Sequence, residues 1–165
     1  TRSSQPANLD AIKYIIENIS DKNVPVIANG DCFKLSDLER ITKYTGAHGV
    51  MAVRGLLSNP ALFAGYTTCP WGCIEKFCYW ALEFGGLPFQ LAQHHLYCML
   101  ENMELKKSLL KEMMNLKNYI SLIDWFNKTF EFKRYGEDGF GMGVEIPYKA
   151  NSCVQRSASV VERQE

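Results

Sequence analysis

Residues 24–31 read Val-Pro-Val-Ile-Ala-Asn-Gly-Asp, and residues 49–55 read Gly-Val-Met-Ala-Val-Arg-Gly. Each stretch is a short apolar run that stops at a turn sequence, a pattern typical of strands buried within a parallel sheet. We therefore predict strands over residues 24–28 and 49–53. These two strands decide the fold class, because the segments around them have the periodicity of helices.

Helical patterns flank both predicted strands. One helix opens at Asn8 with apolar residues at helical spacing, and a second opens near Leu35 and closes at a glycine. Asn59-Pro60 interrupts the pattern, and a short helix follows it. Residues 1–66 thus have the order helix, strand, helix, strand, helix, which predicts two consecutive parallel βα units.

The rest of the chain has a different character. Residues 67–135 carry no strand pattern, and Gly85-Gly86-Leu87-Pro88 is the clearest break in their helical spacing, so we predict a bundle of about four helices. Glycines punctuate the residues that follow, and the chain is polar from Asn151 onward. We predict that residues 136–165 form a loop and a disordered tail. The expected fold class is α/β plus all-α.

Length, charge and cysteine content exclude several classes of protein. The chain has 165 residues, too few for a complete (β/α)8 barrel, which needs roughly 200 to 250. Its 18 basic and 18 acidic residues cancel, so any contact with RNA depends on a local patch. The sequence contains no run of ~18 apolar residues, so we predict no membrane helix, and we expect no signal peptide. Six irregularly spaced cysteines favour reduced thiols, and we expect a cytoplasmic or nuclear protein that is not secreted.

The ends of the two predicted strands carry groups suited to an anionic ligand. Asn29-Gly30-Asp31 forms a turn whose backbone N–H groups can face a phosphate, and Arg54 supplies a guanidinium. In parallel α/β folds, ligands bind at the carboxyl ends of the strands. The alternative is that Asn29-Gly30 is only a turn and that Arg54 is only an ion-pair partner at the surface.

Two stretches of the sequence resemble the flavin-dependent tRNA-dihydrouridine synthases: VPVIANGD, and GAHGVMAVRGLLSNPALF over residues 46–63. Thr1-Arg2 resembles the end of that family's HGRTR signature. RGLLSNPALFAGY and the helical segment after it resemble the eukaryotic branch that acts at positions 20a and 20b of the tRNA D-loop. The resemblance implies the C-terminal portion of a TIM (β/α)8 barrel, namely its last two parallel βα units, followed by a helical domain.

The resemblance also implies a cofactor site and a reaction. FMN sits at the mouth of the barrel in this family, where Asn29, Gly30 and Asp31 match the first phosphate-binding turn and Val53 and Arg54 match the second. NADPH reduces FMN, and the flavin then reduces a uracil of the tRNA with a cysteine as proton donor. That cysteine lies on an early barrel loop that no part of this chain matches. We therefore expect no catalytic residue here and no activity from these residues alone.

Cysteines and histidines that could suggest a metal site have unsuitable spacing. Cys69, Cys73 and Cys78 lack the second closely spaced pair of a zinc site, so we interpret them as reduced thiols. His94 and His95 are adjacent on a helix, where neighbouring side chains point about 100° apart, so one is expected to pack and the other to be exposed. We expect no metal, and we interpret the three tryptophans as helix-packing anchors.

Two groups of basic residues are candidates for contact with tRNA. Lys106, Lys107 and Lys111 follow successive helical turns. Lys133 and Arg134 directly precede Tyr135, and this stretch is a candidate for a basic and stacking contact. The alternative for the first group is a solvated helix face with charges paired to nearby glutamates. The resemblance favours RNA contact, because the helical domain of the family docks on tRNA.

These observations predict the C-terminal part of a monomeric, FMN-dependent tRNA-dihydrouridine synthase that uses NADPH and does not bind a membrane. The alternative is a non-catalytic, helical RNA-binding module that retains a remnant of a barrel. The presence or absence of an upstream barrel distinguishes the two.

Overall fold

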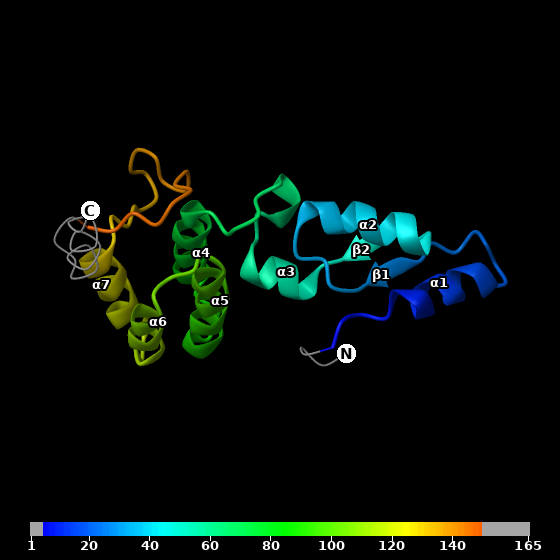
Figure 1. Ribbon diagram of the computed structural model, residues 1–165. Helices are drawn as coiled ribbons and strands as arrows, with labels where there is room; N and C mark the ends of the chain where they lie inside the picture. Colours follow the sequence, from blue (N-terminus) through cyan, green and yellow to red (C-terminus); the bar gives the residue numbers. More distant parts are fainter. Residues whose placement is uncertain (1–4, 150–165) are drawn as a thin grey trace, which may run out of the picture. The chain divides into compact units, whose positions relative to one another are not determined.

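The computed structural model describes residues 5–149 and divides the chain into two compact units, with the boundary between Thr68 and Cys69 (Figure 1). We call residues 5–68 unit 1 and residues 69–149 unit 2. Each unit has its own hydrophobic cluster, so each is described by itself. Across residues 5–149, none of the helices has the length and hydrophobicity that a membrane crossing requires.

Unit 1 is built on a pair of parallel strands. Strands β1 (Ile27–Asn29) and β2 (Gly49–Met51) pair with Ala28 opposite Val50. Just before β1, the Val26 N–H donates to His48 Nδ1 at 3.1 Å, and the Val26 carbonyl accepts from the His48 N–H at 2.9 Å. His48 thereby holds the approach to β1 beside the start of β2.

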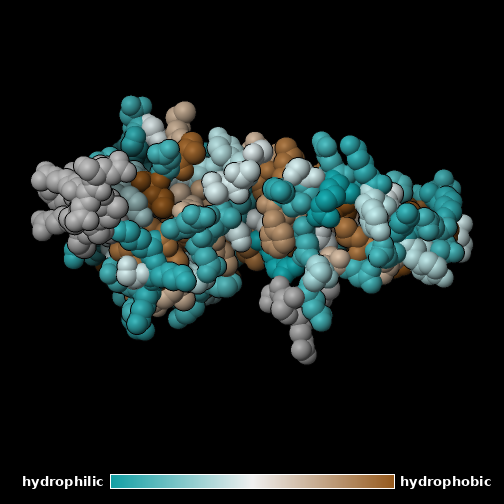
Figure 2. Space-filling view, in the orientation of Figure 1, coloured by the Kyte–Doolittle hydropathy of each residue, from teal (hydrophilic) through white to brown (hydrophobic). Residues whose placement is uncertain are grey.

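Both strands are shorter and more exposed than predicted. Ala28 is buried, but Ile27 is 52% exposed and Met51 is 47% exposed. The expectation of strands buried on both faces is therefore wrong for the described residues. The sheet has two strands, so each strand has a single neighbour along its edges. Figure 2 shows hydrophobic residues at the surface among the hydrophilic ones.

Helix α1 (Leu9–Asn18) begins where the sequence indicates, and helix α2 (Leu35–Thr45) both begins and ends at the predicted residues. The Asn8 side chain caps α1 by accepting from the Ala11 N–H at 3.0 Å. At the start of α2, the Asp37 carboxylate accepts from the backbone N–H groups of the two residues before the helix. Gly46 ends α2 with a φ of 75°, the left-handed conformation expected of a C-terminal glycine.

The segment after β2 departs from the prediction. The strand expected to reach Val53 ends at Met51, and Ala52 caps a six-residue helix, α3 (Val53–Ser58). The buried Asn59 ends α3, because its side chain accepts from the Ala61 N–H and donates to the Tyr66 carbonyl. The short helix predicted after it is the 3-10 turn η1 (Leu62–Ala64). A small core of Ala28, Cys32, Ile41, Ala47, Ala52 and Leu62 holds unit 1 together.

Unit 2 consists of four helices and a C-terminal segment. The helices are α4 (Trp71–Glu83), α5 (Phe89–Asn102), α6 (Lys107–Met114) and α7 (Tyr119–Thr129). Their apolar faces share one core, in which the Trp71 ring lies 4.9 Å from the Phe130 ring and 6.0 Å from the Phe126 ring. The buried Gln93 side chain ties α5 to the end of α6 by donating to the Met113 carbonyl at 2.9 Å.

The segment after α7 returns to the start of α4 and closes unit 2. The backbone N–H groups of Trp71 and Gly72 donate to the carbonyls of Val144 and Gly143, so the first turn of α4 is capped by this segment. A bridge between Phe130 and Tyr148 pairs the segment with the end of α7. The part of the predicted loop up to residue 149 is thus packed on the core, and the predicted tail from residue 151 lies outside the described residues.

Candidate functional site

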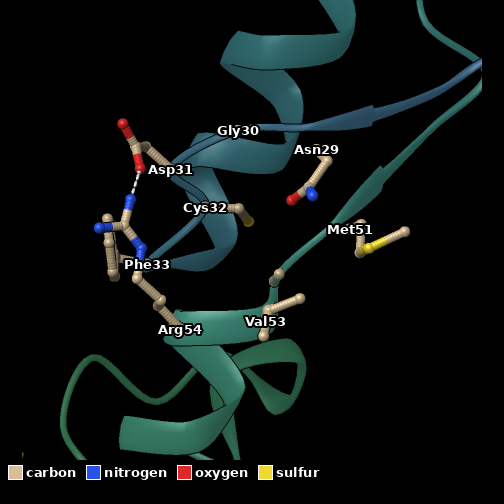
Figure 3. Close-up of a pocket in the computed structure, with 10 residues that line it drawn as sticks. Asn29, Gly30, Asp31, Cys32, Phe33, Met51, Val53 and Arg54 are labelled. Atoms are coloured by element: carbon tan, nitrogen blue, oxygen red, sulfur yellow. Dashed lines mark hydrogen bonds and ion pairs between the residues drawn. The ribbon is translucent and has the colours of Figure 1, made fainter. Parts of the chain in front are cut away.

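A cavity of about 300 Å³ lies at the carboxyl ends of β1 and β2 in unit 1. The turn after β1 contributes Asn29, Gly30 and Asp31 to its lining, and the first turn of α3 contributes Val53 and Arg54. The structure therefore brings together all five residues predicted to bind the cofactor. Figure 3 shows the Asn29 amide pointing into the space between the two strand ends, with Arg54 reaching up from α3.

Arg54 and Asp31 form an ion pair within this cavity (Figure 3). One guanidinium nitrogen of Arg54 donates to Asp31 Oδ1, while Asp31 Oδ2 accepts from the Ala7 N–H at 2.6 Å. The Phe33 ring lies under the guanidinium, 5.4 Å from its central carbon. The pair is compatible with both interpretations of Arg54, because it uses one nitrogen of a guanidinium that has five N–H donors, and 41% of the side chain is exposed.

Two glycines allow the backbone to form this cavity. A Cβ on Gly55 would collide with the Cys32 carbonyl, so only glycine lets α3 approach the turn after β1 so closely. At Gly30, the space of a Cβ is filled by Ala7 at 2.9 Å and by Leu9 at 3.4 Å. The missing side chain of Gly30 therefore accommodates the N-terminal segment, whereas the sequence suggested that it admits a ligand.

The Cys32 side chain is not a reactive group. Cys32 is buried, and this burial together with the nearby Asp37 carboxylate raises the pKa of its thiol. A protonated, buried thiol is a poor nucleophile. Besides the Asp31 carboxylate, which Arg54 neutralises, the cavity offers an amide, a guanidinium and backbone N–H groups. These groups bind and orient an anion, and none of them is an acid that could protonate a substrate.

The basic residues predicted to contact RNA lie along two separate cavities of unit 2. Lys106, Lys107 and Lys111 line a groove of about 820 Å³ at the start of α6, together with Glu101 and Glu104. The acidic residues in this groove leave one net positive charge among the five side chains. Mixed charge of this kind gives only a weak local field for phosphate.

Lys133 and Arg134 line the second cavity, of about 440 Å³, which is bounded by α4 and the segment after α7. Arg134 is exposed, and the Lys133 ammonium donates to the Asp138 carbonyl at 2.7 Å. The aromatic rings of Tyr79, Tyr135 and Phe140 complete this wall. The two basic residues of this cavity were predicted from the sequence, whereas Tyr79 and Phe140 carry no sequence signal for a role here.

The remaining cysteines and histidines of unit 2 lie in both buried and exposed positions. Cys69 and Cys78 are buried thiols, and no group of three or more metal-ligating side chains occurs within residues 5–149. His95 packs on Phe77 with ring centres 5.6 Å apart, while His94 is exposed.

Two side chains in unit 2 differ from expectation. Trp80 is 48% exposed on the outer face of α4, so its prediction as a packing anchor is wrong. Cys73 is half-buried, and the pKa of its thiol is lowered to about 7. A hydrogen bond with Cys69 and the charge of Lys76 lower this pKa, whereas burial raises it.

Comparison with known families gives a match over most of the chain. The family model described as dihydrouridine synthase matches residues 1–159. This range includes all five residues at the ends of β1 and β2 and all four helices of unit 2. The match therefore covers both units rather than one of them.

Curated relatives extend the comparison. The chain is 99% identical over its whole length to the tRNA-dihydrouridine(20a/20b) synthase of Saccharomyces cerevisiae, and it covers 45% of that protein. It is 41% identical over 145 residues to the synthase of the same name from Schizosaccharomyces pombe, covering 42% of it. A human protein named as a similar synthase is 42% identical over 127 residues, with 38% covered. The chain thus spans less than half the length of these relatives.

Proposed function

The chain belongs to the dihydrouridine synthase family, and from that premise we propose that it forms the C-terminal part of an FMN-dependent enzyme that reduces uridine to dihydrouridine in the D-loop of tRNA. The proposal is supported by two relatives named as tRNA-dihydrouridine(20a/20b) synthases, one of which matches the whole chain and the other 87% of it. The bound flavin supplies the two-electron chemistry, with a nicotinamide as electron source. The described residues hold one end of the cofactor and part of the RNA. That the protein is monomeric and cytoplasmic or nuclear stays a prediction.

We propose that unit 1 is the last two βα units of a TIM barrel. The parallel pairing of β1 and β2 around α2 supports this assignment. The exposed faces of Ile27, Met51 and Val53 support it further, because they are the side chains that further strands and barrel residues would cover. Unit 2 is then the helical domain that follows the barrel.

The observation that carries the cofactor assignment is the convergence of five residues on one cavity. Asn29 to Asp31 and Val53 to Arg54 are far apart in the sequence, yet they meet where two parallel strands end. Arg54 keeps guanidinium donors for a phosphate while Asp31 fixes the orientation of the side chain. The site fits the phosphate end of FMN, and its volume is too small for the whole cofactor.

A comparison of FMN with riboflavin tests this assignment, because riboflavin lacks the phosphate. In a chain extended at its N-terminus to the length of the relatives, we expect Arg54→Ala to weaken FMN binding by about ten- to a hundredfold, the effect of losing about 1.5–3 kcal/mol of charged hydrogen bonding. Riboflavin binding should not change. Arg40→Ala, which removes an exposed arginine outside the cavity, is the matched control. Equal losses for both ligands, or no loss of FMN, would refute the phosphate site.

A salt series tests the proposed RNA contact of the α6 groove. Charge reversal at Lys106, Lys107 and Lys111 should weaken tRNA binding. It should also reduce the slope of log K against log salt by about one for each lost phosphate contact. Flavin content should stay the same, because these residues lie outside unit 1. An unaltered slope would return the groove to a solvated helix face, and it would leave the cofactor assignment intact.

The 165-residue chain itself separates the enzyme from the non-catalytic RNA-binding module. We expect this chain to bind tRNA but to retain no flavin, because two strands cannot enclose the cofactor. The extended chain should retain flavin and form dihydrouridine, which mass spectrometry of digested tRNA detects. An extended chain that binds tRNA but forms no dihydrouridine would support the module instead.

A further inference from the structure

The second cavity of unit 2 has a wall of aromatic rings that contact one another. The Tyr79 and Tyr135 rings are nearly parallel, with an interplanar angle of 15° and centres 4.6 Å apart. Phe140 meets both rings edge-on, at 5.9 Å and 5.8 Å. Trp80 extends the row at 4.8 Å from Tyr79. These rings form a surface platform, distinct from the buried core around Trp71.

The outer ring of this platform is open to a ligand. Tyr135 is 66% exposed although Tyr79 covers one of its faces, so its accessible surface includes the opposite face of the ring. The cavity beside it has a volume of about 440 Å³, within the range of sites that bind small ligands. A planar group can therefore extend the existing stack by one layer.

The charged side chains that line the cavity favour an anion beside that planar group. Lys133 and Arg134 are basic, and Glu75 is the acidic residue of the lining. Glu75 is almost fully buried, and both of its oxygens accept hydrogen bonds. The Lys133 ammonium is held by the Asp138 carbonyl, so the exposed Arg134 guanidinium is the group best placed to contact a phosphate.

Glu75 fixes the position of the platform. Its Oε1 accepts from the Trp71 indole at 2.9 Å and from the Lys133 backbone N–H at 3.1 Å, and its Oε2 accepts from the Gly141 N–H at 2.7 Å. One carboxylate thus ties both ends of the segment that carries Arg134 and Tyr135 to α4. The platform is preorganised before any ligand arrives, which reduces the ordering cost of binding.

We propose that this platform binds an unpaired nucleotide of the tRNA, with the base stacked on the open face of Tyr135 and its phosphate on Arg134. The inference rests on the proposed tRNA substrate and adds a site for single-stranded RNA to it. Base stacking on aromatic rings tolerates any base, and an adjacent cation contacts the backbone. Glu75 is a positioning residue for this site.

The experiment measures binding of fluorescein-labelled octauridine to the 165-residue chain by anisotropy at several salt concentrations. Tyr135→Ala should weaken binding by about tenfold, within the range of five- to about 150-fold known for the loss of one stacked base. The slope of log K against log salt should stay unchanged, because no charge is lost. Tyr135→Phe should bind as the wild type does, since a phenyl ring also stacks. Arg134→Ala should lower the slope by about 0.7, the value for one phosphate of a single strand.

Two controls distinguish a stacking site from a general effect. Tyr14→Ala removes a tyrosine of matched exposure, 67%, from the other unit and should not change binding. An RNA duplex of eight base pairs has no unpaired base, so Tyr135→Ala should bind it as the wild type does. If Tyr135→Ala unfolds unit 2, Tyr135→Leu keeps the apolar volume without a flat ring and should show the same loss for octauridine.

Two results would overturn the inference. One is octauridine affinity of a folded Tyr135 variant within twofold of the wild type. The other is a loss of affinity for the duplex equal to the loss for octauridine, which would show a general effect on RNA binding and no stacking site. Neither result affects the proposed enzyme, whose failure appears separately as an extended chain that forms no dihydrouridine in tRNA.

Discussion

Unit 1 and unit 2 differ in how far each completes its own core. Unit 2 buries fifteen apolar residues in one cluster, whereas unit 1 buries six. Unit 2 also closes on itself, because the segment after α7 caps α4. In unit 1 the sheet has only two strands, and the apolar side chains Ile27 and Val53 beside it are more than half exposed.

The difference teaches that the two units depend on their surroundings to different degrees. Unit 2 has the properties of a module that folds alone, because its own helices and C-terminal segment enclose a core of fifteen apolar residues. Unit 1 exposes sheet faces and edges that further strands would cover, and open edges of this kind favour aggregation. The predictions that follow test this contrast, from the largest expected effect to the smallest.

Removal of a large core side chain should unfold one unit without the other. Phe126→Ala is expected to destabilise unit 2 by about 3–5 kcal/mol, because it leaves a cavity among Trp71, Phe130 and Phe132. All three tryptophans lie in unit 2, so intrinsic fluorescence reports on its unfolding alone. Hydrogen exchange in α2 of unit 1 should not change. A coupled loss of protection in α2 would show that the units unfold together.

Substitution of Glu75 should destabilise unit 2 by a smaller amount. In Glu75→Gln, the amide nitrogen that replaces one oxygen cannot accept a hydrogen bond, so the Gly141 or Lys133 N–H loses its acceptor. A buried unsatisfied donor costs about 1–3 kcal/mol. Urea unfolding followed by fluorescence measures the loss. Glu83→Gln, on the same helix, is the control, and equal stability of the two variants would contradict the role given to Glu75.

Acidification should weaken unit 1 through Asp37. Burial alone would raise the pKa of this carboxyl, but hydrogen bonds from the Phe33 and Lys34 N–H groups and from Arg40 lower it below its usual value. The charged form is thus favoured in the folded state, so its contribution is present at neutral pH and is lost as the pH falls through the folded pKa, below about 4.

A variant isolates this contribution. Asp37→Asn should cost about 1 kcal/mol at neutral pH, the usual effect of losing a helix cap, and it should remove this part of the acid dependence. Circular dichroism during urea unfolding at pH 7 and pH 3 provides the measurement. If the variant and the wild type differ in free energy of unfolding by the same amount at pH 7 and at pH 3, the charged Asp37 side chain does not stabilise unit 1 as proposed.

The smallest effect concerns the reactivity of Cys73, without a change in stability. Because the hydrogen bond with Cys69 lowers the pKa of Cys73 to about 7, its thiolate forms near neutral pH. Iodoacetamide should modify Cys73 half-maximally near pH 7 and before the buried Cys78, whose pKa is raised by burial. Cys69→Ala should move the reaction of Cys73 to higher pH. Peptide mass spectrometry measures both, and an unchanged profile in Cys69→Ala would refute the hydrogen bond.

Local signals in the sequence predicted the helix boundaries well. Asn8 and Gly46 mark the start of α1 and the end of α2 because each acts through its own backbone neighbours. The meeting of Asn29 to Asp31 with Arg54 was also predictable, since parallel strands place their carboxyl ends at one edge.

Contacts between distant residues were not predictable. Val53 was expected to end a strand, but the chain turns into α3 there because Gly55 packs against the Cys32 carbonyl. Glu75 had no sequence signal, because its partners Lys133 and Gly141 are 58 and 66 residues away. Trp80 was expected to pack between helices because large aromatic residues usually do, and no sequence pattern showed that its side chain turns outward.

The backbone contact between Gly72 and Gly141 has a consequence for genetics. A Cβ on Gly72 would collide with the Gly141 backbone, and Gly72 also donates to the Gly143 carbonyl. Any substitution at Gly72 therefore pushes the segment that carries Arg134 and Tyr135 away from α4. In a screen for alleles that lose RNA binding, Gly72 should emerge with conditional, temperature-sensitive phenotypes although it contacts no RNA. Suppressors should map to the 141–144 segment rather than to the platform.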